Sequence, residues 1–247
     1  MTPTEHLKEH VDALVAEIVR ADQSFYVLRT IAAHTDALNA KNYGEVFQLL
    51  QAVLQDRAVL AVGKLFDKES NRYPTQSVAF LLTFLKRNRD ALRITQRSLL
   101  LREILAWNGV GLPDEPQDCE LTDCIVAHYS DSRPNADLNT LAELDVALHA
   151  LKTHRDKRIA HAENISPAQL PSAKWTDTRR LLDWARRLVS TVGMAYLGTF
   201  YTTPDGRYLL EDDARRAGVA LSRLFKAAGI GKTETQEAEH GAARYAR

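Results

Sequence analysis

Cysteine is scarce in this chain, and neither sign of charge prevails. Only two cysteines, Cys119 and Cys124, occur among the 247 residues, five positions apart. Two thiols are too few for a disulfide framework, which indicates a reducing compartment. Lysine plus arginine equals aspartate plus glutamate at 32 each, so the formal net charge is zero. The chain as a whole therefore lacks the basic balance typical of nucleic-acid or membrane surfaces, and any anion site must be local.

The chain also lacks a hydrophobic run long enough for a membrane. The longest apolar stretches, such as residues 78–82 and 99–101, are far too short to cross a bilayer. The first six residues, MTPTEH, are polar and contain no signal-peptide core. We therefore expect a cytoplasmic protein without a membrane partner.

Glycine (11 residues) and proline (8 residues) are few, and they interrupt long patterns of apolar residues at every third or fourth position. Thr75 or Ser77 is placed to cap one of the helices that these patterns predict. The predicted helices span about residues 4–39, 45–66, 77–107 with a break near 87–90, 121–129, 138–162, 176–201 and 210–228. No strand with sustained two-residue alternation is seen, so the predicted fold is all-α.

We divide the chain by its helices and its composition. Residues 1–40 are predicted to form an N-terminal helix, 41–203 a helical bundle and 204–228 a C-terminal helix. From residue 229 to 247 the composition is polar and poor in bulky apolar residues, which predicts a disordered tail.

The densest group of candidate functional residues ends the helix predicted over 138–162. The segment HRDKRIAH, residues 154–161, holds two histidines and three lysine or arginine residues. At about 100° per residue, Arg155 falls in the middle of the apolar stripe of this helix. Its guanidinium stays charged and is costly to bury unpaired, so Arg155 either pairs with a carboxylate or lines a cleft or a subunit interface. His154, Arg158 and His161 share the flank of that stripe.

These side chains suit the cleavage of a phosphodiester bond in RNA. An imidazole takes the proton from a 2′-hydroxyl or protonates a leaving 5′-oxygen, and a guanidinium holds the non-bridging phosphate oxygens. This chemistry needs no metal. A structural interpretation stands beside it, because the macrodipole favours basic residues in the last turn of any helix.

The segment resembles the motif of HEPN ribonucleases. Arg155, then five residues, then His161, with Asp156 directly after the arginine, matches the HEPN pattern. The phrase RDKRIAHAE, residues 155–163, is similar to the abortive-infection U-type branch of that superfamily. Residues 56–82, with GKLFD at 63–67 and SVAFLL at 77–82, resemble the helix–loop–helix that precedes the catalytic helix in that branch.

The resemblance, over roughly residues 10–200, implies an all-α, HEPN-like helical bundle with extra N- and C-terminal helices. It implies a homodimer that forms one composite, metal-independent ribonuclease site without a cofactor. His161 would be the acid/base residue, Arg155 the phosphate clamp, and Asp156 would orient the pair. Arg155 and His161 lie about 120° apart on a straight helix, which favours a contribution from a second subunit. The remaining candidates for RNA binding are His154, Lys157 and Arg158, the last also an alternative clamp.

Three functions remain open from the sequence. The first is a metal-independent endoribonuclease acting on RNA, as a phage-defence or toxin–antitoxin effector with an antitoxin protein as a further partner. The second is a non-catalytic HEPN module that binds RNA or a partner protein. The third is a purely structural helical dimer in which a buried acid satisfies Arg155.

Three other sequence patterns are weaker indications of a functional site. His6 and His10 fit a His-x-x-Glu-His zinc pattern but lie in the first turns of a helix, where we interpret them as a solvated face. Cys119, Cys124 and His128 are interpreted as packing residues on a short helix rather than metal ligands. A basic group on the helix at 176–201 either follows an RNA backbone or forms a solvated face; its members are Arg179, Arg180, Arg186 and Arg187.

Overall fold

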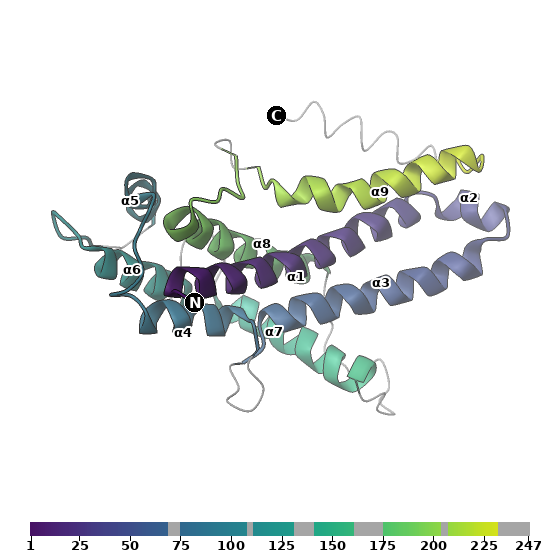
Figure 1. The fold of residues 1–247 in the computed structure, drawn as a ribbon. Coiled ribbons are helices and arrows are strands. Elements are labelled where there is room, and N and C mark those ends of the chain that lie inside the picture. Colours follow the sequence, from purple (N-terminus) through teal and green to yellow (C-terminus); the bar gives the residue numbers. More distant parts are fainter. Residues whose placement is uncertain (69–74, 108–110, 131–140, 161–174, 204–206, 232–247) are drawn as a thin grey trace. The chain divides into compact units, whose positions relative to one another are not determined.

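The computed structural model describes residues 1–68, 75–107, 111–130, 141–160, 175–203 and 207–231 (Figure 1). Within these ranges the chain is helical, with one isolated β-bridge between Thr202 and Tyr208. The predicted all-α class is confirmed. In the part of the chain described here, no helix is both long and apolar enough to span a membrane. The tail predicted to be disordered lies outside the described residues, apart from its first three.

The helices follow one another in the order shown in Figure 1. In chain order they are α1 (Pro3–Ala32), α2 (Thr35–Ala40), α3 (Gly44–Leu65), α4 (Val78–Arg87), α5 (Arg97–Ala106), α6 (Asp118–Ser130), α7 (Leu141–His154), the π-helix η1 (Arg155–Ala160), α8 (Trp175–Val192), the π-helix η3 (Gly193–Leu197) and α9 (Leu210–Ala227).

The first helix ends earlier than the sequence predicts. Instead of one helix to residue 39, α1 stops at Ala32 and α2 begins at Thr35. The side chain of His34 donates from Nδ1 to the carbonyl of Thr30 at 2.8 Å, and the Thr35 hydroxyl donates to the carbonyl of Ala32 at 3.0 Å. These side chains take up carbonyls of the last turn, and such local bonds compete with continuation of the helix.

The capping and the break predicted for the third helix are confirmed. The Ser77 hydroxyl accepts a hydrogen bond from the Phe80 amide at 3.3 Å and caps α4. Helix α4 ends at Arg87, and the Asn88 side chain donates to the Phe84 carbonyl at 2.9 Å. The chain then runs without a regular helix to Arg97, where α5 begins.

Packing divides the chain into two compact units. Unit 1 comprises Met1–Ile18 and Leu60–Leu209, and unit 2 comprises Val19–Val59 and the chain from Leu210 onward. In unit 1, α7 packs against α8, α4 packs against α6, and α5 packs against η3 and α6. Helix α8 supplies the largest share of this core, with Leu181, Leu182, Trp184, Ala185, Leu188, Val189 and Val192 buried.

Unit 2 has a small apolar core that includes the aromatic ring of Phe225 on α9. This ring is 1% exposed and packs with the buried side chains of Ile31 and Leu38. Helix α9 approaches α1 closely at Gly218, where a Cβ atom would lie 3.1 Å from the carbonyl oxygen of Tyr26. Glycine at this position therefore permits the backbone-to-backbone contact.

A buried polar group connects three helices of unit 1. The Tyr129 hydroxyl lies 3.0 Å from that of Thr191, and Thr191 in turn donates to the carboxylate of Glu103. Next to it, the imidazole of His128 stacks on the Trp107 ring with centroids 3.8 Å apart and planes 7° from parallel. Burial, and to a lesser degree the charge of Arg187, lowers the pKa of His128 to about 4.

Lowering the pH is expected to reduce stability through His128. Because its pKa in the folded chain lies near 4, below the ordinary value of 6.5, only the unfolded chain takes up a proton as the pH falls through 6.5. The stabilisation is therefore complete above pH 6.5 and is lost between pH 6.5 and 4. The free energy of unfolding, measured in urea, should fall less between pH 7 and pH 5 in His128→Gln than in wild type.

The matched control for that measurement is His149→Gln. His149 is exposed on α7, so this variant should keep the pH dependence of the wild type. An unchanged pH dependence in His128→Gln would show that the stacked imidazole does not resist protonation.

Candidate functional site

The helix that carries the basic segment changes its form at Arg155. The sequence predicts one α-helix over 138–162, but α7 ends at His154 and residues 155–160 form the π-helix η1. A π-helix closes its hydrogen bonds over five residues rather than four, and such turns occur frequently at functional sites. The angle of about 120° between Arg155 and His161, which assumes a straight α-helix, therefore no longer applies.

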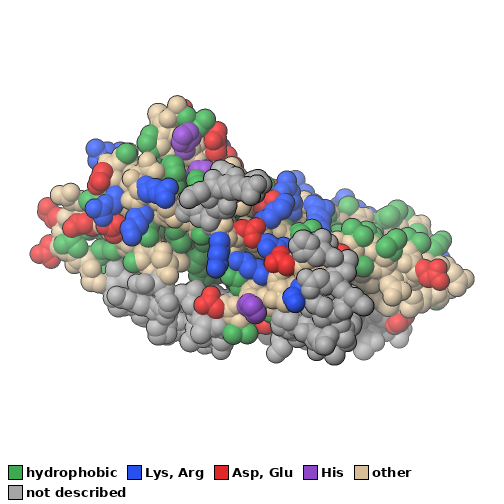
Figure 2. Space-filling view, turned by 90° about the horizontal axis from the view of Figure 1, so that it is seen from below, with side chains coloured by type: hydrophobic (Ala, Val, Ile, Leu, Met, Phe, Trp, Pro, Cys, Tyr) green, Lys and Arg blue, Asp and Glu red, His purple; other side chains and the backbone are tan. Residues whose placement is uncertain are grey.

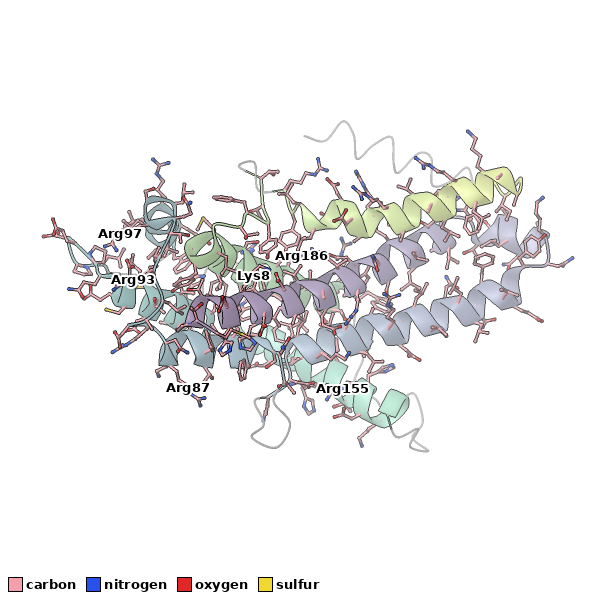
Figure 3. The ribbon with its side chains drawn as sticks, in the orientation of Figure 1. Lys8, Arg87, Arg93, Arg97, Arg155 and Arg186 are labelled. Carbon is pink, nitrogen blue, oxygen red and sulfur yellow. The ribbon has the colours of Figure 1, made fainter. Side chains whose placement is uncertain are left out.

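Arg155 is held by two carboxylates. Its Nη1 donates to Asp67 at 2.6 Å and its Nε donates to Asp156 at 2.7 Å. The side chains of Arg155 and Asp67 are 19% and 27% exposed, whereas that of Asp156 is 52% exposed. Figure 3 labels Arg155 beside the end of α3, from which Asp67 follows. Of the alternatives open from the sequence, the pairing of Arg155 with a carboxylate is the one found.

Burial and pairing act in opposite directions on this guanidinium. Burial lowers the pKa of Arg155, but the hydrogen bonds to Asp156 and Asp67 outweigh it and raise the pKa above its ordinary value. The group is therefore a permanent cation. Of the five N–H donors of a guanidinium, these bonds use two. Within the described residues, the other three remain for a further anion.

Gly63 gives Arg155 the room to lie against α3. A Cβ atom at this buried position would lie 3.2 Å from Cδ and 3.3 Å from Nη1 of Arg155. Both distances are tighter than ordinary van der Waals contacts, so a side chain here would require the Arg155 side chain to shift by a few tenths of an ångström.

A second cation lies one turn before Arg155. The Lys152 ammonium donates to the carbonyl of Phe66 at 2.6 Å, which satisfies a carbonyl just past the end of α3. Burial, together with the positive charges of Arg155 and Lys68, lowers the pKa of Lys152 against the opposing effect of Asp67 and Asp156. The four groups at 67, 152, 155 and 156 thus form one charge cluster, which we call the Arg155 cluster.

The Arg155 cluster joins the two stretches that resemble HEPN proteins. GKLFD at 63–67 ends α3, and the motif starts at Arg155, 88 residues beyond Asp67. Sequence reasoning did not assign a role to Gly63, Asp67 or Lys152. The signal for Asp67 is the need of Arg155 for a carboxylate, and the signal for Lys152 is its position three residues before Arg155 on the same helix face.

The structure describes the other predicted site residues unevenly. His154 and Lys157 are half-buried and flank Arg155 and Asp156. Arg158 lies within η1, where only its backbone is described, and His161 lies outside the described residues. The structure therefore brings Arg155 and Asp156 together, and the predicted pairing of Arg155 with His161 stays a prediction.

The interpretation of the His6–His10 pair as a solvated face is wrong for His10. Its ring packs on Phe80 and Phe84 of α4, with centroids 4.6 and 5.2 Å away. Burial, and then the nearby His6, lowers the pKa of His10. Among the described residues, no group of three or more histidine, cysteine, aspartate or glutamate side chains is placed to hold a metal ion.

Two of the four arginines in the basic group on α8 are paired with neighbouring side chains. Arg186 pairs with Asp183, and its guanidinium lies 5.3 Å from the centre of the Tyr208 ring. Arg180 lies 3.9 Å from Asp177. On the face shown in Figure 2, basic and acidic side chains are likewise intermingled, in keeping with the zero net charge of the chain.

Asp67→Asn is expected to lower the free energy of unfolding by about 1–2 kcal/mol, because it leaves a largely buried guanidinium with only the more exposed of its two carboxylates. Asp156→Asn is the matched control. Asp156 also pairs with Arg155 but is half-exposed, so its loss should change stability by less than about 0.5 kcal/mol. Urea denaturation measures both, and equal effects of the two variants would contradict the ranking of these ion pairs.

The chain matches a known protein family over most of its length. The family model HEPN_AbiU2, described as AbiU2, matches residues 4–220, which include all of the Arg155 cluster. A search of curated proteins and a search of solved structures each found no match. Membership of this family implies a role in abortive-infection phage defence. The resemblance seen in the sequence is thus confirmed, and the chain belongs to the AbiU2 family of HEPN domains.

Proposed function

We propose that this chain is a metal-independent endoribonuclease that cleaves RNA in the cytoplasm during abortive infection, as a homodimer. The observation that carries the proposal is the way in which the guanidinium of Arg155 is held. Arg155 is the first residue of a π-helical turn, and Asp67 fixes its guanidinium. Counting partners among the described residues, three of its donors remain for a phosphate. His161, six residues further along, supplies the acid/base group.

The proposed reaction is an attack of the 2′-hydroxyl on the neighbouring phosphorus. One imidazole takes the proton of that hydroxyl, the bond from phosphorus to the 5′-oxygen breaks, and a second imidazole protonates the leaving oxygen. The products are a 2′,3′-cyclic phosphate and a 5′-hydroxyl. Two copies of His161, one from each subunit, supply the two imidazoles, and Arg155 stabilises the charge on the non-bridging oxygens.

The two carboxylates on Arg155 have different roles in this proposal. The Asp67 pair is largely buried and holds the guanidinium against Gly63. The Asp156 pair is half-exposed, and exposed ion pairs contribute only about 0–1 kcal/mol. A phosphate can therefore take the place of Asp156 on Nε while Asp67 keeps the guanidinium in position.

Because the charges of the Arg155 cluster balance one another, binding of RNA needs further basic residues. Within the Arg155 cluster, the cations of Arg155 and Lys152 are balanced by Asp67 and Asp156. The cluster alone does not attract a polyanion. In the proposed complex, Lys157 and Arg158 supply the net positive charge that draws the RNA backbone to the site, and His154 supplies a further hydrogen-bonding group.

A second candidate is a non-catalytic HEPN module that binds RNA or a partner protein. The observation in its favour is that Arg155 already has two carboxylate partners within one chain, so its charge is satisfied without a substrate. The purely structural role for Arg155 rests on the same contacts. An antitoxin protein that keeps the nuclease inactive fits the first candidate, and such a partner would cover the Arg155 cluster.

The test is cleavage of a mixed-sequence RNA by purified protein in EDTA. His161→Ala and Arg155→Gln should each lower the cleavage rate by about 100-fold or more, because acid/base transfer and charge stabilisation each contribute on that scale. His149→Ala, an exposed histidine of α7, is the matched control and should cut at the wild-type rate.

Circular dichroism of each variant shows whether it is folded before its rate is interpreted. Cleavage by all the folded variants at the wild-type rate would exclude catalysis by this motif. Wild-type protein that binds RNA without cutting it would favour the non-catalytic module.

A further inference from the structure

A polar pocket of about 520 Å³ lies in unit 1 apart from the Arg155 cluster. Five of its lining residues come from the segment that joins α4 to the first residue of α5, namely 89, 90, 92, 93 and 97. The others are residues 115–119, which lead into α6. We call it the α5–α6 pocket. Figure 3 labels Arg93 and Arg97, two of its lining residues. None of its lining residues has a role in the function proposed above.

The walls of the α5–α6 pocket are held by hydrogen bonds from the backbone. The amide of Ile94 donates to the Asp118 carboxylate at 3.1 Å, and the amide of Thr95 donates to the carbonyl of Ala195 at 2.7 Å. Ala195 belongs to the π-helix η3. Leu92, 1% exposed, anchors the same segment in the core. The pocket is therefore formed before any ligand arrives, which reduces the entropy lost on binding.

Arg93 is the arginine of this pocket that is left for a ligand. Arg97 pairs with Asp118 at 2.6 Å, and Arg89 pairs with Asp123 at 2.5 Å. Arg93 is exposed and has no hydrogen bond or ion pair within the described part of the chain. Its fork of donors matches the geometry of phosphate oxygens.

The same pocket also contains carboxylates, of which Asp118 pairs with Arg97 and Asp90 lies 3.9 Å from Arg89. The exposed carboxylate of Glu115 lines the pocket and, within the described residues, has no ion pair. A simple inorganic anion would leave this carboxylate unused and would be repelled by it. A ligand with a phosphoryl anion at one end and amino donors at the other uses both groups. Nucleotides of cytosine, adenine and guanine have this chemistry, because their bases carry amino groups that a glutamate accepts.

We propose that the α5–α6 pocket binds one nucleotide, with its phosphate on Arg93 and the amino group of its base on Glu115. The volume of about 520 Å³ lies within the range of small-molecule sites. We assign the nucleotide to the RNA strand, as a binding subsite away from the Arg155 cluster. That assignment rests on the proposed function, whereas a free nucleotide would provide the same chemistry.

The test measures binding and does not depend on cleavage. A labelled 2′-O-methyl RNA of mixed sequence lacks the attacking hydroxyl and stays intact, so the wild-type chain can be titrated with it by fluorescence anisotropy in EDTA. Arg93→Gln should weaken this binding about tenfold and lower the slope of log affinity against log salt by about one. Arg93→Lys should restore part of the affinity. The control is Arg102→Gln, an exposed arginine of α5 outside the pocket, which should bind as wild type does.

A second titration, with cytidine and uridine monophosphates, separates the sources of the nucleotide. Weaker RNA binding in Arg93→Gln supports the strand as the ligand. Loss of mononucleotide binding alone supports the pocket with a free nucleotide as its ligand. Glu115→Gln should reduce the preference for cytidine over uridine monophosphate. If Arg93→Gln binds both the RNA and the mononucleotides as Arg102→Gln does, the proposal is wrong, whether or not the chain cuts RNA.

Discussion

The ion pair between Arg155 and Asp67 is the interaction on which the candidate site depends. It connects the end of α3 with the first residue of η1. Gly63 has no side chain, which leaves room for the guanidinium beside α3. An always-charged group that is 19% exposed must be paired, so the chain folds with the motif held against α3. Any role of Arg155 in chemistry therefore begins from a guanidinium whose position is already fixed.

The helical fold was predictable because its signals are local. Apolar spacing gave the all-α class, and Ser77 was recognised as a cap because capping depends on residues only three apart. The early end of α1 was missed, since His34 and Thr35 bond to carbonyls in a way that the apolar pattern does not report. The π-helical form of residues 155–160 was missed for a similar reason, because a short π-turn preserves much of the apolar pattern.

The candidate site was only half predictable. The position of Arg155 on the apolar stripe predicts that it needs a carboxylate partner. The identity of that partner depends on tertiary packing, because Asp67 lies 88 residues earlier in the chain. The family resemblance covers both stretches. In the structure, Gly63 and Asp67 of the GKLFD stretch contact Arg155 at the start of the motif, and the carbonyl of Phe66 accepts from Lys152. No sequence pattern predicted the α5–α6 pocket, because its lining comes from two separate segments of the chain.

The most direct test of this account is the single-turnover rate of RNA cleavage by Asp67→Asn, at a temperature where the variant is folded. If Asp67 positions the clamp, the rate should fall by about tenfold or more while RNA affinity is unchanged, because small displacements of a positioned group are costly. Asp183→Asn, which removes the partner of Arg186 on α8, is the matched control and should cut at the wild-type rate. Cleavage by folded Asp67→Asn at the wild-type rate would contradict the claim that this ion pair builds the site.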